Sequence, residues 1–147
     1  MRILYLCTGN AARSLMAEAF TRSLAPAAAG LEAYSAGVDP KGIHPETRVV
    51  MQEVGVDMSG YRSKGLSEVP FDSMDLVVTL CDDARSRCPA PPTAARRLHW
   101  GLADPAAATG TPEQIRERFR GSRDEVKTCV KRLLFELATD PNRRAGR

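Results

Sequence analysis

Two short apolar runs, at residues 3–6 and 75–80, and two less regular segments, at residues 31–37 and 96–100, predict β-strands, and the stretches around them have the patterning or composition of α-helices. The clearest strand is the continuous β-branched run at residues 75–80, which is typical of a strand buried in a parallel sheet. The clearest helix follows Thr111, which begins a capping-box pattern with proline at the first helical position. The predicted elements are strands at residues 3–6, 31–37, 75–80 and 96–100, and helices at residues 12–24, 45–54, 82–87 and 111–138.

The alternation of strands and helices predicts an α/β fold, with a four-stranded parallel sheet and helices on both faces. Right-handed crossovers restrict the topology, and the strand order 2-1-3-4 is the simplest candidate. We expect one catalytic domain over residues 1–140 and a basic tail at residues 141–147. Ligands of such sheets bind beyond the carboxyl ends of the strands, at the switch point between the first and third strands. Residues that directly follow these strands are therefore the first candidates for a functional site.

The composition excludes few functions, but it bears on the number of domains, the charge of the substrate and the cellular compartment. The 147 residues suffice for one domain with a sizeable core, and 21 Lys and Arg against 18 Asp and Glu give a net charge of +3. This balance gives no strong case for nucleic acid, although it suits an anionic substrate. The sequence has no apolar run of about 20 residues and no secretory signal before the first strand. We therefore expect a cytoplasmic monomer without a membrane partner, whose cysteines are reduced unless they are catalytic or redox-active.

Zinc binding is one alternative function for the cysteines. The spacing of Cys81, Cys88 and Cys129, with only His44 and His99 available, matches no paired zinc-ligand pattern. Cys129 also lies on the apolar stripe of the last helix, so we expect it to be buried in the core. We predict neither a metal nor a cofactor, and we expect His44, next to a proline, to cap a helix.

The turn between the first strand and the first helix holds the main chemical motif: Cys7, Thr8, Gly9, Asn10, Ala11, Ala12, Arg13 and Ser14. Successive backbone N–H groups at a helix N-terminus form a cradle for an oxyanion. Arg13 can add a bidentate fork to two oxygens of that anion. Cys7 lies where the helix dipole and Arg13 both favour the thiolate. Gly9 permits close backbone approach, and Asn10 and Ser14 can brace the loop or the sulfur through side-chain hydrogen bonds.

A cysteine that ends a strand can also be a small buried hydrophobe, but the strand-to-helix setting of Cys7 favours a nucleophile. Residues Cys7 to Ser14 resemble the C-x5-R-S loop of the low-molecular-weight protein tyrosine phosphatase superfamily, which includes the thioredoxin-coupled arsenate reductases. The variant TGNAARS followed by Met-Ala-Glu is more similar to the reductase branch. The resemblance covers nearly the whole chain and implies a flavodoxin-like fold.

The resemblance also implies a general acid at Asp104, because the superfamily keeps an Asp before Pro in the corresponding late loop. In the tyrosine phosphatases this loop continues with aromatic residues that hold the phenol ring. This chain has alanines at positions 106–108 instead. A site without a stacking surface is better suited to a small inorganic oxyanion.

Cys81 directly follows the third strand, so we expect it on the same rim as Cys7. In the reductases that the chain resembles, the positions of Cys81 and Cys88 carry a redox relay. The resemblance thus implies that Cys7 attacks arsenate and that Cys81 then forms a disulfide with Cys7, releasing arsenite. Cys88 next attacks Cys81, and the resulting disulfide is reduced by thioredoxin, since an internal disulfide calls for a dithiol reductant.

Glu18 and Lys64 have two alternative interpretations. In some family members the residue matching Glu18 belongs to a cation site near the active loop, whereas some potassium-binding members carry an acidic residue where this chain has Ser63 and Lys64. The Lys64 ammonium is then a replacement for the metal ion and pairs with Glu18. In the other interpretation, the side chains of Glu18 and Lys64 are both solvated and do not form a site.

Two other functions remain open at this point. The first is a phosphatase that uses Cys7, Arg13 and Asp104 on phosphotyrosine or small phosphate esters, for which Cys81 and Cys88 would be dispensable. The second is a non-catalytic oxyanion-binding or redox-sensing protein, which multiple turnover with a reductant would exclude.

Overall fold

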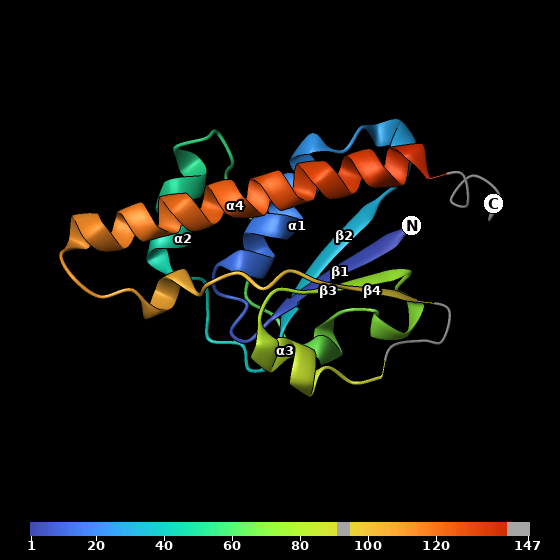
Figure 1. The fold of residues 1–147 in the computed structure, drawn as a ribbon, viewed down its shortest axis with the longest axis horizontal. Coiled ribbons are helices and arrows are strands. Elements are labelled where there is room, and N and C mark those ends of the chain that lie inside the picture. The colour runs from blue at the N-terminus through green and yellow to red at the C-terminus, as the bar shows by residue number, and fades with distance from the viewer. Residues whose placement is uncertain (91–94, 141–147) are drawn as a thin grey trace.

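The computed structural model describes residues 1–90 and 95–140, which form one parallel sheet of strand order β2-β1-β3-β4 with helices on its two faces (Figure 1). The strands are β1 (Arg2–Cys7), β2 (Glu32–Gly37), β3 (Leu76–Thr79) and β4 (Arg96–His99). The helices are α1 (Arg13–Leu24), α2 (Pro45–Gln52), α3 (Asp82–Arg87) and α4 (Pro112–Thr139). Short 3-10 helices cover Ala27–Ala29 (η1), Leu66–Glu68 (η2), Phe71–Ser73 (η3) and Pro105–Ala107 (η4).

The predicted fold class and strand order are confirmed. Each predicted strand and helix is present with its bounds displaced by at most two residues, the first strand being extended to Cys7. The register pairs Cys7 with Gly37 on one side and Leu6 with Thr79 on the other. The carboxyl ends of β2, β1 and β3 therefore meet at one rim of the sheet, where the predicted site residues lie. The predicted tail, residues 141–147, lies outside the described residues.

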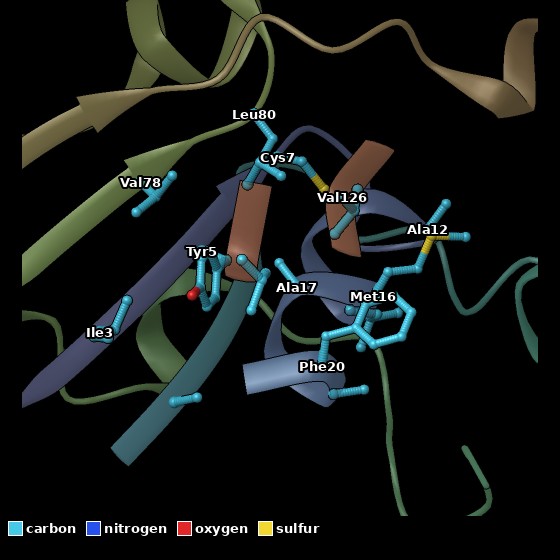
Figure 2. Packing of buried hydrophobic residues seen from close by; sticks show 14 of the residues in the cluster. Ile3, Tyr5, Cys7, Ala12, Met16, Ala17, Phe20, Val78, Leu80 and Val126 are labelled. Atoms are coloured by element: carbon cyan, nitrogen blue, oxygen red, sulfur yellow. The ribbon is translucent and has the colours of Figure 1, made fainter. Parts of the chain in front are cut away.

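Alternation along β1 divides the core between the two faces of the sheet. Ile3, Tyr5 and Cys7 project toward α1, where Phe20 packs in the same cluster (Figure 2). Leu4 and Leu6 belong to a smaller cluster on the opposite face, which α3 and the 3-10 helices η2 and η3 cover. The larger cluster includes residues of α1, α2 and α4, which lie together on one side of the sheet (Figure 1).

α1 is buried on nearly every side, because it lies between the sheet and α4 (Figure 1). The Tyr5 hydroxyl reaches the buried Thr21 at 2.7 Å, and the Thr21 hydroxyl donates to the carbonyl of Ala17 at 2.8 Å. Burial raises the pKa of Tyr5 to about 12, so this side chain stays neutral in the core. The nucleophile loop therefore leads into a rigidly packed helix.

Cys129 does not occupy the core, and the prediction that it is buried there is wrong. Val126, Val130, Leu133 and Leu137 form the buried stripe of α4, as expected, whereas Cys129 is only partly buried and belongs to neither core cluster. With 3.6 residues per turn, Cys129 lies about 70° from the centre of that stripe. It is therefore on the flank of the helix.

An acid-sensitive connection joins α2 to α4. The Glu53 carboxylate accepts hydrogen bonds from Arg120 at 2.8 Å and Arg123 at 2.9 Å, and these arginines lower its pKa to about 2, the Arg120 bonds contributing most. Because the pKa is lower in the folded state, this carboxylate stabilises the protein above about pH 4.5, and the contribution is lost as the pH falls toward 2. Glu53→Gln should lower the urea midpoint at neutral pH, with the difference from wild type shrinking over that interval.

Urea titrations from neutral pH to pH 2 measure this difference. Glu136→Gln is the matched control, because Glu136 is an exposed α4 residue with no ion pair within the described part of the chain. A Glu53→Gln deficit that stays constant as the pH falls would contradict the assignment.

Candidate active site

The loop between β1 and α1 is held from behind by the segment at residues 38–44. Four backbone N–H groups of this segment bond loop carbonyls: Val38 to Cys7 at 3.1 Å, Asp39 to Thr8 at 2.8 Å, Lys41 to Gly9 at 2.9 Å and His44 to Ala11 at 3.0 Å. In a trans peptide the N–H points opposite to the C=O, and the chain has no cis peptide bond among its described residues. The N–H groups of residues 8, 9, 10 and 12 therefore point away from the segment, and they donate to no acceptor in the described residues. They are available to an anion.

Two backbone features let the loop curl this tightly. Asn10 has a φ of 45°, in the left-handed region that asparagine tolerates better than most residues. A Cβ on Gly37 would lie 2.8 Å from both Asn10 N and Thr8 O, so only glycine allows β2 to approach the loop so closely.

Cys7 is 2% exposed, and its Sγ lies 2.8 Å from the Ser14 hydroxyl. The Asn10 side-chain amide donates to Ser14 Oγ at 2.7 Å, so the hydroxyl proton of Ser14 is free to donate to the sulfur. The orientation of the Asn10 amide is fixed in turn, because its Oδ1 accepts from the backbone N–H of Lys64 at 2.8 Å. The predicted bracing roles of Asn10 and Ser14 thus correspond to a hydrogen-bond chain that ends at the sulfur.

Arg13 is 5% exposed and connects the loop to the ends of β3 and β4. One of its terminal nitrogens donates to the carbonyls of Leu102 at 2.9 Å and Leu80 at 3.4 Å, and the other lies 3.7 Å from Asp104 Oδ1. The Arg13 Nε is buried and has no hydrogen-bond partner among the described residues. A buried donor of this kind is costly unless a ligand meets it, which supports an anion-binding role.

A cavity of about 260 Å³ brings the predicted reactive groups together. It is lined by Cys7, Thr8, Gly9, Ala11, Ala12, Arg13, Lys41, Asp104, Ala106 and Ala107. No aromatic ring lines it, so it offers no stacking surface to a phenol. A larger hollow of about 480 Å³ between η4 and α4 contains neither Cys7 nor Arg13, and the chemistry therefore belongs to the smaller one.

Asp104 lies at the edge of this cavity, where the sequence placed it. Its Oδ1 accepts from the backbone N–H of Ala106 at 3.0 Å, which caps η4. Its side chain is 48% exposed, so it can exchange protons with solvent. A half-exposed carboxyl group at the edge of the cavity can carry a proton between solvent and an oxygen of a bound anion.

Cys81 is brought to the same rim by the short helix α3. It occupies the N-cap, where its Sγ accepts from the backbone N–H of Ala84 at 3.3 Å. The Thr8 hydroxyl lies 3.2 Å from this sulfur and donates to Asp83 Oδ2 at 3.0 Å. Thr8 therefore connects the Cys7 loop directly to the second thiol.

Cys88 lies at the opposite end of α3, as its C-cap, and its thiol donates to the carbonyl of Pro89 at 3.3 Å. Burial raises the pKa of this thiol, and neighbouring Arg97 partly offsets the effect. All four cysteines are free. Cys81 and Cys88 are thus separated by the whole of α3.

Glu18 and Lys64 are not solvated, which removes the alternative interpretation of both. The Glu18 side chain is 3% exposed; it accepts from Ser35 at 2.5 Å and pairs with Arg22 at 2.7 Å and with Lys64 at 3.4 Å. The Lys64 ammonium also donates to Ser35 at 3.3 Å. It donates to the carbonyl of Arg62 at 3.0 Å as well, so the ammonium lies among three oxygens.

Two residues near the site were missed by sequence reasoning. Lys41 lines the cavity, and His99 Nε2 lies 3.1 Å from Asp82 Oδ1 at the start of α3. Lys41 comes just after the second strand, and the end of that strand borders the end of the first. This position was the signal that could have placed Lys41 near the Cys7 loop. His44 caps α2 as expected, its Nδ1 accepting from the backbone N–H of Glu46. In residues 1–90 and 95–140, no three His, Cys, Asp or Glu side chains are grouped so as to hold a metal ion.

The chain belongs to the low molecular weight phosphotyrosine protein phosphatase family, whose model matches residues 2–143. Within it, the chain is similar to the arsenate reductase of Halalkalibacterium halodurans, with 40% identity over 129 residues, 88% of this chain and 91% of that protein. The family resemblance seen in the sequence is confirmed.

Solved structures agree with this assignment. An arsenate reductase in the oxidized state superposes with a TM-score of 0.77 at 29% identity, over 92% of this chain and 98% of that one. A thioredoxin-dependent arsenate reductase of Corynebacterium glutamicum gives a TM-score of 0.63 at 27% identity, over 88% of this chain and 61% of that one.

Proposed function

We propose that the protein reduces arsenate to arsenite through a Cys7, Cys81 and Cys88 relay that thioredoxin regenerates. The observation that carries this proposal is the 3.2 Å contact between Thr8 of the nucleophile loop and the Cys81 sulfur. It brings a second thiol to the rim where Cys7 and Arg13 face one cavity. The similarity to proteins named arsenate reductase supports the choice of substrate.

In the first step the loop N–H groups and Arg13 bind the oxyanion, and the Cys7 thiolate attacks arsenic. A sulfur–arsenic bond forms, and one oxygen leaves as water after Asp104 protonates it. The Arg13 Nε, which has no partner in the described part of the chain, supports this role, because a bound oxygen would satisfy it. The Ser14 hydroxyl, 2.8 Å from the sulfur, stabilises the Cys7 thiolate before this attack and again when the third step frees it.

In the second step the Cys81 thiolate attacks the Cys7 sulfur. The sulfur–sulfur bond forms as the sulfur–arsenic bond breaks, and arsenic keeps the electron pair and leaves as arsenite. Two thiols are thereby oxidised to a disulfide while As(V) is reduced to As(III). In the third step Cys88 attacks Cys81, which frees Cys7 and leaves a Cys81–Cys88 disulfide for thioredoxin.

The third step requires α3 to change shape. Seven helical steps separate the two cysteines by about 10 Å along the axis, whereas a disulfide needs Cα atoms within about 7 Å. We expect α3 to unwind on oxidation and to expose the disulfide to its reductant. Amide exchange at residues 81–90 should therefore be faster in the oxidised protein than in the reduced one, while the rate in β1 stays unchanged. Equal rates in the two redox states would contradict the unwinding.

The chemistry of this reaction indicates the compartment in which the protein acts. A relay that ends in an internal disulfide needs a reducing compartment, so we propose a cytoplasmic monomer with thioredoxin as its partner. None of the described helices is both long and apolar enough to be a membrane span. We also propose that the Lys64 ammonium, 3.4 Å from Glu18, replaces a metal ion beside the loop.

A phosphatase acting on small phosphate esters is the second candidate, favoured by the Arg13 and Asp104 geometry that both reactions share. Turnover assays distinguish the two. Arsenite formation from arsenate with thioredoxin, thioredoxin reductase and NADPH should be sustained by the wild type and lost in Cys7→Ser, Cys81→Ser and Cys88→Ser. Cys129→Ser is the matched control and should keep full turnover. Efficient ester hydrolysis that only Cys7→Ser abolishes, without arsenite formation, would replace the reductase by a phosphatase.

A further inference from the structure

Lys41 is a cation at the substrate cavity that neither the oxyanion loop nor the relay uses. It lines the cavity together with Cys7 and Arg13. Its side chain is exposed and forms no ion pair with the described residues. An unpaired ammonium at the opening of an anion cavity raises the local concentration of anions.

The position of Lys41 is fixed by its backbone. Its N–H donates to the carbonyl of Gly9 at 2.9 Å, in the middle of the bonds that join residues 38–44 to the loop. A Cβ built on Gly9 would meet Lys41 Cβ, Cγ and Cδ at 3.7 Å each. The aliphatic stem therefore lies against the loop, and the charge cannot be far from the cavity that the stem borders.

The charge balance of the cavity depends on this lysine. The Arg13 guanidinium lies 3.7 Å from the Asp104 carboxylate, which offsets much of its charge. The Cys7 thiolate adds a negative charge where the substrate must bind. Lys41 makes the formal side-chain charge of this lining one unit more positive, from −1 to zero when Cys7 and Asp104 are ionised, and from zero to +1 when Asp104 carries the proton that it donates. In either state the added charge attracts a doubly charged oxyanion more strongly than a singly charged one.

We infer that Lys41 is a substrate-recruiting residue that favours doubly charged over singly charged oxyanions at the Cys7 loop. The inference takes its substrate class from the proposed function, but the charge that Lys41 adds beside Cys7 is present whether or not arsenate is reduced. A test that uses Cys7 alkylation therefore stands apart from the reductase assay.

The test compares alkylation of Cys7 by anionic iodoacetate and by neutral iodoacetamide, followed at the Cys7 peptide by mass spectrometry. Removing a unit charge several ångströms away at an intermediate dielectric constant should lower the iodoacetate-to-iodoacetamide rate ratio by about threefold to tenfold. We expect this fall in Lys41→Gln and a near wild-type ratio in Lys41→Arg. Lys131→Gln removes the same charge from an exposed position on α4 and should leave the ratio unchanged.

Protection of Cys7 by inorganic phosphate gives an independent measure. Phosphate should protect Cys7 from iodoacetamide more weakly in Lys41→Gln than in the wild type, and this protection should depend less on the salt concentration. In the reductase assay the same variant should raise KM for arsenate while kcat stays within about twofold. The inference would be overturned if Lys41→Gln and Lys131→Gln had the same iodoacetate-to-iodoacetamide rate ratio and phosphate protected Cys7 as well in Lys41→Gln as in the wild type. Failure of arsenate reduction in the wild type, with the ratio still sensitive to Lys41, would overturn the proposed function alone.

Discussion

Replacing Arg13 with lysine should lower kcat/KM for arsenate by about 10²-fold to 10³-fold, the usual cost of losing a preorganised oxyanion donor. Lysine keeps the charge but loses the planar fork and the buried Nε donor, which has no partner in residues 1–90 and 95–140. It also cannot reach the Leu80 and Leu102 carbonyls in the same geometry. Steady-state kinetics with a thioredoxin-coupled assay measures the effect.

Arg132→Lys is the matched control, since Arg132 is an exposed α4 residue that makes no ion pair in the part of the chain the structure describes. Thermal unfolding of both variants separates loss of the site from loss of the fold. An Arg13→Lys enzyme with kcat/KM within a few-fold of wild type would show that charge alone, not the guanidinium fork, binds the anion.

The buried pair beside the loop should give the largest loss of stability from a single charge change. Glu18→Gln keeps the shape of the side chain but leaves Lys64, whose side chain is 13% exposed, without its carboxylate. Breaking a buried pair in this way costs about 3–5 kcal/mol in the free energy of unfolding. Urea denaturation of the reduced protein measures it.

A double variant tests whether the two charges depend on each other. In Glu18→Gln combined with Lys64→Met, the orphaned ammonium is gone, so the loss should be smaller than in Glu18→Gln alone. Glu125→Gln, at an exposed position on α4 that makes no ion pair with the described residues, should change stability little. If the second substitution made the loss larger and fully additive, the pair would not be coupled.

Much of the fold was predictable because β1 and β3 are compact apolar runs and several connections have a turn or capping signal. The run at residues 75–80 could only be a buried strand, and Cys7 and Cys81 follow neighbouring strands, so their common rim followed from topology. Placing Asp104 on that rim depended on the family resemblance, because an isolated Asp-Pro is more often a turn.

Other features depend on tertiary contacts that the periodicity of the sequence does not predict. Glu18 is buried because α1 lies between the sheet and α4, although its sequence position is compatible with a solvated face. Cys129 fits the apolar repeat but lies on the flank of α4, outside the stripe that packs in the core. The proximity of Lys41 to the loop comes from four backbone bonds between residues 38–44 and the loop carbonyls, which no local pattern encodes.

The most direct test of the relay is to map the disulfide left after one turnover. Fully reduced enzyme is mixed with excess arsenate without thioredoxin, the thiols are blocked, and the peptides are identified by mass spectrometry. The relay predicts one arsenite per enzyme with a Cys81–Cys88 disulfide in the wild type, and a trapped Cys7–Cys81 disulfide in Cys88→Ser. Arsenite formed with no disulfide at Cys81 in either protein would contradict the account.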